Sequence, residues 1–299
     1  MVWVETTAHI IQDPATQHLK VLFFIRDIDK EKKHELILQY QSQRDSLTGL
    51  LNKGSTEAQI QSVLENDPQS LHALLVLDID ELKKMQDEKY REFHNKIIGA
   101  EVEVIGLRSP IVKDIAKKIA KGDWEGFLAQ KKGKYYEETT LRGQVIGFAK
   151  ADKETIKKYI ERYIDEIDNW GICDTFIGNL KIIKKEKEYF YPMVKRMAES
   201  EEQWKIRFGL ITLMSCYIEK EYINEIFRIC SRVKNKEYYV QMGQAWLIST
   251  LFIKFRDETL EYLKDNSLDK WTQNKAIQKI RESFRVSEED KELVKSLKK

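Results

Sequence analysis

The sequence predicts an all-α solenoid of stacked helix pairs, preceded by a small α+β fragment. From about Asp87 onward the apolar side chains recur with the period of a helix, and this period persists to the end of the chain. Alternation of the β type is confined to the first part. A chain of 299 residues with 42% hydrophobic content can bury one large core or two modest ones. We therefore divide it into residues 1–84 and 85–299.

The N-terminal fragment begins with a predicted β-hairpin. Residues 2–11 and 19–27 alternate apolar and polar side chains, and Asp13-Pro14 lies between them. A charged helix is expected from about Asp29 to Arg44, followed after a short stretch by a second helix. Residues 74–79 have the continuous apolar character of a buried central strand, although few partner strands remain to pair with it.

Two short stretches in this fragment carry a resemblance. The octet Asp45-Ser-Leu-Thr-Gly-Leu-Leu-Asn52 and the strand Leu74-Leu-Val-Leu-Asp-Ile-Asp80 resemble the end of a PAS sensor joined to the start of a GGDEF diguanylate cyclase. The resemblance stops near Lys84. Asp78 would correspond to a metal ligand of that family, but without the signature loop there is no nucleotide site for the metal to serve, and no metal site is expected. No Gly-Gly-Asp/Glu-Glu-Phe signature occurs in the chain, so neither cyclase activity nor cyclic-dinucleotide signalling is expected. We interpret residues 1–84 as a truncated fragment with exposed strand edges.

Helix start signals recur through residues 85–299. Ser109 is the expected N-cap of a helix that has Pro110 at its first position. Asp123 and Asp152 can cap the next helices, and Ser287 to Asp290 has the spacing of a capping box. Roughly a dozen helices with short connections are predicted, which is typical of a helical solenoid. No strict repeat is legible in the sequence.

Charge and cysteine content limit the class of protein. Residues 1–84 carry 9 Lys+Arg against 13 Asp+Glu, and residues 85–299 carry 42 against 36, so the helical part is the basic part. The three cysteines show no CxxC spacing, which favours a reduced, cytoplasmic setting. No leader segment is expected, and the longest nearly unbroken apolar run, 208–218, is shorter than the roughly 20 residues that span a bilayer. We expect a soluble protein; its oligomeric state stays open.

The residue inventory narrows the chemistry available to the helical part. All five histidines lie within the first 94 residues, so Ser-His, Cys-His and histidine–metal sites are not expected in the helical body. Carboxylates, aromatic rings and cations remain, without metal or organic cofactor. In Trp170-Gly-Ile-Cys-Asp174 an indole and a carboxylate fall one helical turn apart on one face. Arg207 and Trp246 each lie on a separate amphipathic stretch.

These segments together resemble the DNA alkylation-repair glycosylases of the AlkD type, which are HEAT-like helical-repeat solenoids. The resemblance runs from about Glu88 to about Phe284 and includes 106–110 and 274–280. It implies a DNA repair enzyme that hydrolyses the N-glycosidic bond of cationic N3- or N7-alkylated purines in double-stranded DNA. The damaged base would stay largely stacked while the protein holds the backbone, and the enzyme would associate with the nucleoid when bound.

The resemblance also implies residue roles. Asp174 would stabilise the oxocarbenium-like transition state, and Trp170 and Trp246 would flank the deoxyribose. Arg207 would hold the phosphate near the lesion. Phe93 or, as the alternative, Tyr90 would correspond to an aromatic residue that the family places near the lesion. The residues themselves add a basic cluster, Lys131, Lys132 and Lys134, as the best candidate for a phosphate track.

Structural interpretations compete with each of these roles. A tryptophan on an amphipathic helix is more often a core residue, and Asp174 alone is also compatible with a helix cap or half of an arginine pair. Trp204 is expected to be a structural indole. Asn169, Gly171 and the pair Met242-Gly243 depart from the family pattern. The alternative function is a non-catalytic HEAT-like solenoid that binds bent or branched DNA.

Overall fold

The computed structural model describes residues 3–12, 19–44, 51–66, 82, 84–98 and 103–299. The chain divides into two compact units, Met1–His72 and Ala73–Lys299. This division falls twelve residues before the boundary expected from the sequence.

The first unit contains the predicted hairpin and helices. Strands β1 (Val4–Gln12) and β2 (Leu19–Asp27) pair antiparallel, with Val4 opposite Asp27. Helices α1 (Asp29–Ser42) and α2 (Lys53–Asn66) follow. The expected strand at 74–79 and most of the octet at 45–52 lie outside the described residues.

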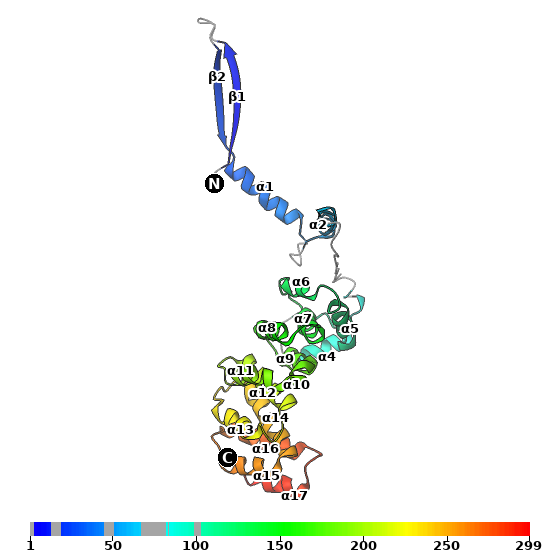
Figure 1. The fold of residues 1–299 in the computed structure, drawn as a ribbon, viewed down its shortest axis with the longest axis vertical. Coiled ribbons are helices and arrows are strands. Elements are labelled where there is room, and N and C mark those ends of the chain that lie inside the picture. The colour runs from blue at the N-terminus through cyan, green and yellow to red at the C-terminus, as the bar shows by residue number, and fades with distance from the viewer. Residues whose placement is uncertain (1–2, 13–18, 45–50, 67–81, 83, 99–102) are drawn as a thin grey trace. The chain divides into compact units, whose positions relative to one another are not determined.

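The second unit is an all-α helical-repeat solenoid, as the sequence predicts. Its helices are α4 (Glu88–Ile98), α5 (Ser109–Ile119), α6 (Trp124–Ala129), α7 (Tyr136–Phe148), α8 (Lys153–Ile164), α9 (Trp170–Asn179), α10 (Lys181–Lys185), α11 (Lys187–Ala198), α12 (Gln203–Cys216), α13 (Ile223–Arg232), α14 (Tyr238–Lys254), α15 (Arg256–Lys264), α16 (Lys270–Glu282) and α17 (Glu288–Lys295). Figure 1 shows them following one another in sequence order within this unit.

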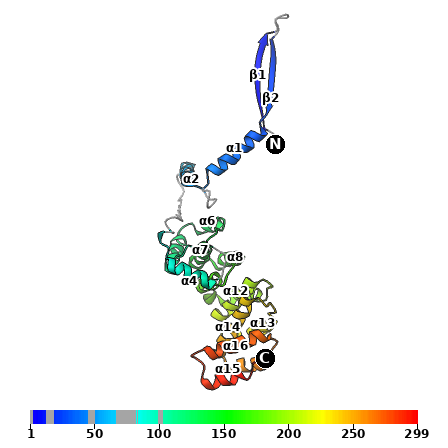
Figure 2. The same ribbon diagram turned by 180° about the vertical axis from the view of Figure 1, so that it is seen from behind.

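Six helices of the second unit pack on one another in a row. Helix α5 packs on α7, α7 on α9, α9 on α12, α12 on α14, and α14 on α16. We call these six helices the central row. The views in Figures 1 and 2 agree that α12, α14 and α16 lie side by side. Helices α6, α8, α11, α15 and α17 each contact a member of this row.

The contacts between successive repeats have a regular spacing in sequence. Arg232 donates to Glu199, 33 residues earlier, at 2.7 Å. Arg256 donates to Asp290, 34 residues later, at 2.8 Å. Asn235 donates to the carbonyl oxygen of Glu201, also 34 residues away. The structure therefore reveals a repeat of about 33 residues that the sequence analysis did not identify.

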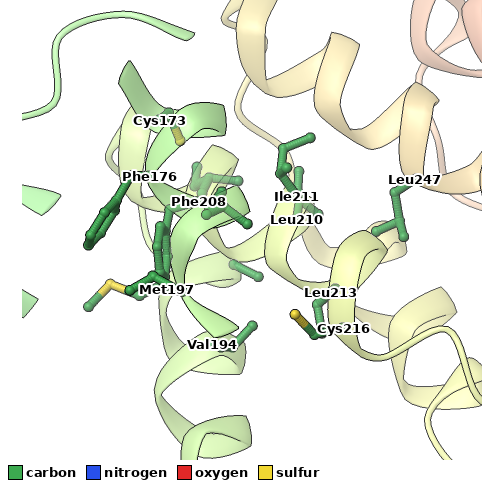
Figure 3. Close-up of a cluster of buried hydrophobic side chains, with 14 of the residues drawn as sticks. Cys173, Phe176, Val194, Met197, Phe208, Leu210, Ile211, Leu213, Cys216 and Leu247 are labelled. Carbon is green, nitrogen blue, oxygen red and sulfur yellow. The ribbon is translucent and has the colours of Figure 1, made fainter. Parts of the chain in front are cut away.

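The core lies between the central row and the helices that flank it. Figure 3 shows part of it, where Phe176 of α9 and Phe208 of α12 meet at 6.0 Å between ring centroids. Helix α12 also approaches α11 closely at Gly209, where an added Cβ would lie 2.3 Å from the backbone nitrogen of Ala198. This glycine lets the two helices pack backbone to backbone.

Most of the predicted helix caps are present. Asp123, Asp152 and Ser287 accept hydrogen bonds from the first turns of α6, α8 and α17. The prediction for Ser109 is wrong by one residue, because α5 begins at Ser109 itself and Arg108 is the N-cap. The capping box at Ser287 is half formed, since the Asp290 carboxylate accepts from Arg256 instead.

Candidate active site

The structure brings Asp174 and Arg207 together in a bidentate ion pair. Arg207 on α12 donates from Nε to Oδ1 of Asp174 at 3.0 Å and from Nη2 to Oδ2 at 2.8 Å. The Arg207 side chain is 4% exposed, whereas that of Asp174 on α9 is 19% exposed. The carboxylate is thus fixed in orientation by a buried partner while one side of it still faces solvent.

The next repeat completes this network. Nη1 of Arg207 donates to the carbonyl oxygen of Tyr239 on α14 at 2.8 Å. An added Cβ at Gly243 would lie 3.7 Å from Nη1, so α14 passes close to the guanidinium at this point. Trp246, 42% exposed, is three residues beyond Gly243 and therefore on the same face of α14. Asp174, Arg207 and Trp246 come from three successive helices of the central row.

The beginning of α9 sets the position of Trp170 and Asp174. Asn169 is the N-cap and accepts from the backbone nitrogen of Ile172 at 3.0 Å. An added Cβ at Gly171 would lie 2.9 Å from the Tyr136 hydroxyl, so α7 packs tightly against this turn. Asn169 and Gly171, two of the departures from the family pattern, therefore both serve this junction. Trp170 is half-buried there.

Cys173 is not a second reactive group at this site. It is fully buried, and burial raises the pKa of its thiol above the usual range, with the neighbouring Asp174 charge acting in the same direction. A thiol in such surroundings is a poor nucleophile. Cys173 is therefore a small core residue.

The helix starts of the central row carry aromatic residues that sequence reasoning missed as a set. Tyr136, Trp170, Trp204, Tyr238 and Trp271 occupy the first or second position of α7, α9, α12, α14 and α16, spaced 33 or 34 residues apart. We call them the aromatic row. Trp204 meets Tyr239 at 5.3 Å, Tyr239 meets Tyr238 at 5.2 Å, and Tyr238 meets Trp271 at 5.8 Å. The constant spacing was the signal that could have identified the repeat.

The expectation that the helical body contains no histidine is wrong. His94 lies on α4 and packs edge-on against Tyr136 at 4.4 Å. Burial lowers the pKa of His94, and burial also raises the pKa of Tyr136 to about 12. The rings that His94 contacts are those of Tyr90 and Tyr136. The described residues contain no cluster of three or more side chains that could hold a metal ion.

The residues predicted to contact DNA differ in how free their side chains are to bind a ligand. Lys131 is exposed, but Lys132 donates to the Glu166 carbonyl at 2.9 Å, and Lys134 pairs with Glu103 at 3.0 Å. Two of the three lysines in the expected phosphate track are thus already held by acceptors within the protein.

Phe93 on α4 is 59% exposed and remains available for contact. Within the described ranges, no helix has both the length and the apolar character needed to cross a bilayer.

Comparison with known proteins identifies the family of the chain. No curated protein shows significant similarity to the chain. No match supports the resemblance of residues 1–84 to PAS and GGDEF domains. The family model described as "DNA alkylation repair enzyme" matches residues 79–280, which include the expected range from Glu88 nearly to its end and all of Trp170, Asp174, Arg207 and Trp246. The chain therefore belongs to the DNA alkylation repair enzyme family.

Proposed function

We propose that the protein is a DNA glycosylase that hydrolyses the N-glycosidic bond of N3- or N7-alkylated purines in duplex DNA. The observation that carries this proposal is the Asp174 carboxylate, which is held at both oxygens by Arg207 and yet partly exposed. An alkylated purine already bears a positive charge, so it can leave with the bonding electron pair and become neutral. The positive charge then passes to the deoxyribose.

A carboxylate fixed beside that sugar stabilises the transition state more than the ground state. Its charge is already oriented, so little reorganisation is needed when the sugar becomes cationic. Each Asp174 oxygen accepts one bond from Arg207 and keeps lone-pair capacity for an attacking water. Water then adds to C1′ and loses its proton to the carboxylate or to solvent, which leaves an abasic site.

Arg207 has a different task in this proposal from the phosphate contact expected from the sequence. Three of its five N–H donors are engaged by Asp174 and Tyr239, and its side chain is almost completely buried. We therefore assign it as a positioning residue for Asp174. Trp170 and Trp246 remain the proposed partners of the cationic sugar, since both present part of an indole to solvent near this pair.

Substitution of the carboxylate tests the proposal. We expect Asp174→Asn to slow release of N7-methylguanine from alkylated duplex DNA by at least about a hundredfold, the usual cost of removing a preorganised electrostatic group. Base release is measured by chromatography under single-turnover conditions, after a melting curve has shown that the variant is folded.

Asp168→Asn is the matched control, because Asp168 is an ion-paired carboxylate just before α9 that contacts Lys132 instead of Arg207. It should retain the wild-type rate. Equal rates for wild type and Asp174→Asn would remove the carboxylate from the mechanism. Tight DNA binding without base release by the wild type would favour the non-catalytic alternative.

A further inference from the structure

A cationic groove lies on α16, outside the Asp174–Arg207 network. It is a cavity of about 790 Å³ open to solvent, and it is lined by Lys270, Trp271, Lys275, Arg281 and Lys298 among others. Glu282 is the one acidic residue of this lining. We call this cavity the α16 groove. Its charge suits an anionic partner.

Three of these cations are not paired with a carboxylate of the described residues. Arg281 lies 3.5 Å from Glu292, but Lys270, Lys275 and Lys298 have no carboxylate oxygen within 4 Å in the part of the chain that the structure describes. Lys132 and Lys134, by contrast, are held within the protein. The ammonium group of Lys275 lies 5.6 Å from the centroid of the Trp271 ring, which restricts its position through a cation–π contact.

The amide side chains of the groove favour backbone contact over reading of base edges. Asn274 donates to the carbonyl oxygen of Lys299 and accepts from its backbone nitrogen. Gln278 accepts from Lys275 and donates to Glu282. Both amides are thus engaged within the protein. The groups left for a ligand are the ammonium groups and one indole face, which suit phosphates and sugars.

A series of ring contacts places the groove close to the candidate active site. Arg207 lies 5.9 Å from the ring centroid of Tyr239, which is 5.2 Å from that of Tyr238, which in turn is 5.8 Å from Trp271. End to end, these contacts limit the separation of Arg207 and Trp271 to about 17 Å, or roughly five nucleotide steps along one strand. A duplex held at Asp174 therefore has flanking phosphates within reach of α16.

We infer that the α16 groove binds the phosphodiester backbone of duplex DNA on one flank of the lesion, with Lys270, Lys275 and Lys298 as the contacting cations. The inference rests on the proposed DNA substrate but not on the glycosylase step. It assigns the phosphate track to α16 in place of Lys131–Lys134.

The test replaces the three lysines together, as Lys270→Gln/Lys275→Gln/Lys298→Gln in the full chain. We expect the affinity for an undamaged duplex, measured by fluorescence anisotropy, to fall by about tenfold or more at moderate salt. The slope of log affinity against log salt should become shallower by about one unit for each lysine that contacts a phosphate. The single-turnover rate at saturating DNA should stay at the wild-type value, because Asp174 and Arg207 are untouched.

Lys264→Gln on α15 is the control for a single lysine, since it removes one positive charge at an exposed lysine that pairs with Glu261. It should leave both affinity and salt slope unchanged. An unaltered affinity and slope in the triple variant would overturn the inference, as would an equal loss in Lys264→Gln. Asp174→Asn should bind duplex DNA normally, so failure of the glycosylase proposal and failure of this one give different results.

Discussion

The chemistry of the site depends on how one carboxylate is held. Asp174 alone is compatible with a surface carboxylate, a cap or half of an ion pair, and the structure shows the ion pair. A bidentate contact with a buried guanidinium fixes both the position and the plane of the carboxylate. The chemistry expected of Asp174 therefore depends on Arg207 as much as on the carboxylate itself.

Replacing Arg207 distinguishes a positioning role from a phosphate contact. We expect Arg207→Gln to lower the single-turnover rate of base release by about tenfold or more, since Asp174 loses its orientation. The affinity for undamaged duplex and its salt dependence should not change. A parallel loss of affinity with a shallower salt slope would instead show that Arg207 contacts DNA.

Arg207→Gln should also destabilise the folded protein. Removing one partner of a buried pair leaves the other unsatisfied, so Arg207→Gln should reduce the free energy of unfolding by about 3 kcal/mol. The loss is measured by urea unfolding. In the double variant Asp174→Asn/Arg207→Gln the loss should be smaller than the sum of the two single losses, because neither partner is then left as an isolated charge.

At the scale of the helix, close approach of backbones sets the position of α12 and with it Arg207. Gly209→Ala would place a Cβ 2.3 Å from a backbone nitrogen of α11, which cannot move aside as a side chain can. We expect a loss of about 3 kcal/mol or more in the free energy of unfolding, from overpacking.

Gly178→Ala on α9 is the matched change, because nothing lies within 4 Å of its added Cβ. It should stabilise the protein by about 0.5 kcal/mol through helix propensity alone. Both values come from urea unfolding. Equal effects of the two substitutions would contradict the packing described for Gly209.

The sequence predicted the helices better than the contacts between them. Helical periodicity and capping residues such as Asp123 and Asp152 gave the helix starts, because these signals are local. The Arg207–Asp174 bond and the Tyr239 carbonyl that completes it join residues 33 and 32 apart, and no local pattern indicates such contacts. The aromatic row was visible as a spacing, but only the structure showed that its members begin neighbouring helices.

At the scale of the whole molecule, the second unit carries all the residues assigned to the site. In a stack of repeats each repeat contacts its neighbours, so stability is a sum of local terms. The unit Ala73–Lys299 is therefore expected to fold without the hairpin unit.

A chain beginning at residue 73 tests this expectation. It should release N7-methylguanine at the full-length rate and unfold at the same temperature, as measured by single-turnover assay and circular dichroism. A large drop in either quantity would show that residues 1–72 support the second unit.

The reach of Arg207 across three helices has a mechanical consequence. Its guanidinium connects Asp174 on α9 to the Tyr239 carbonyl oxygen on α14. The lengths of these hydrogen bonds therefore depend on the distance between the two helices. Bending that moves α9 away from α14 would lengthen the hydrogen bonds of Arg207 to Asp174 and Tyr239. The curvature of bound DNA would thus change the position of the Asp174 carboxylate through one side chain, Arg207.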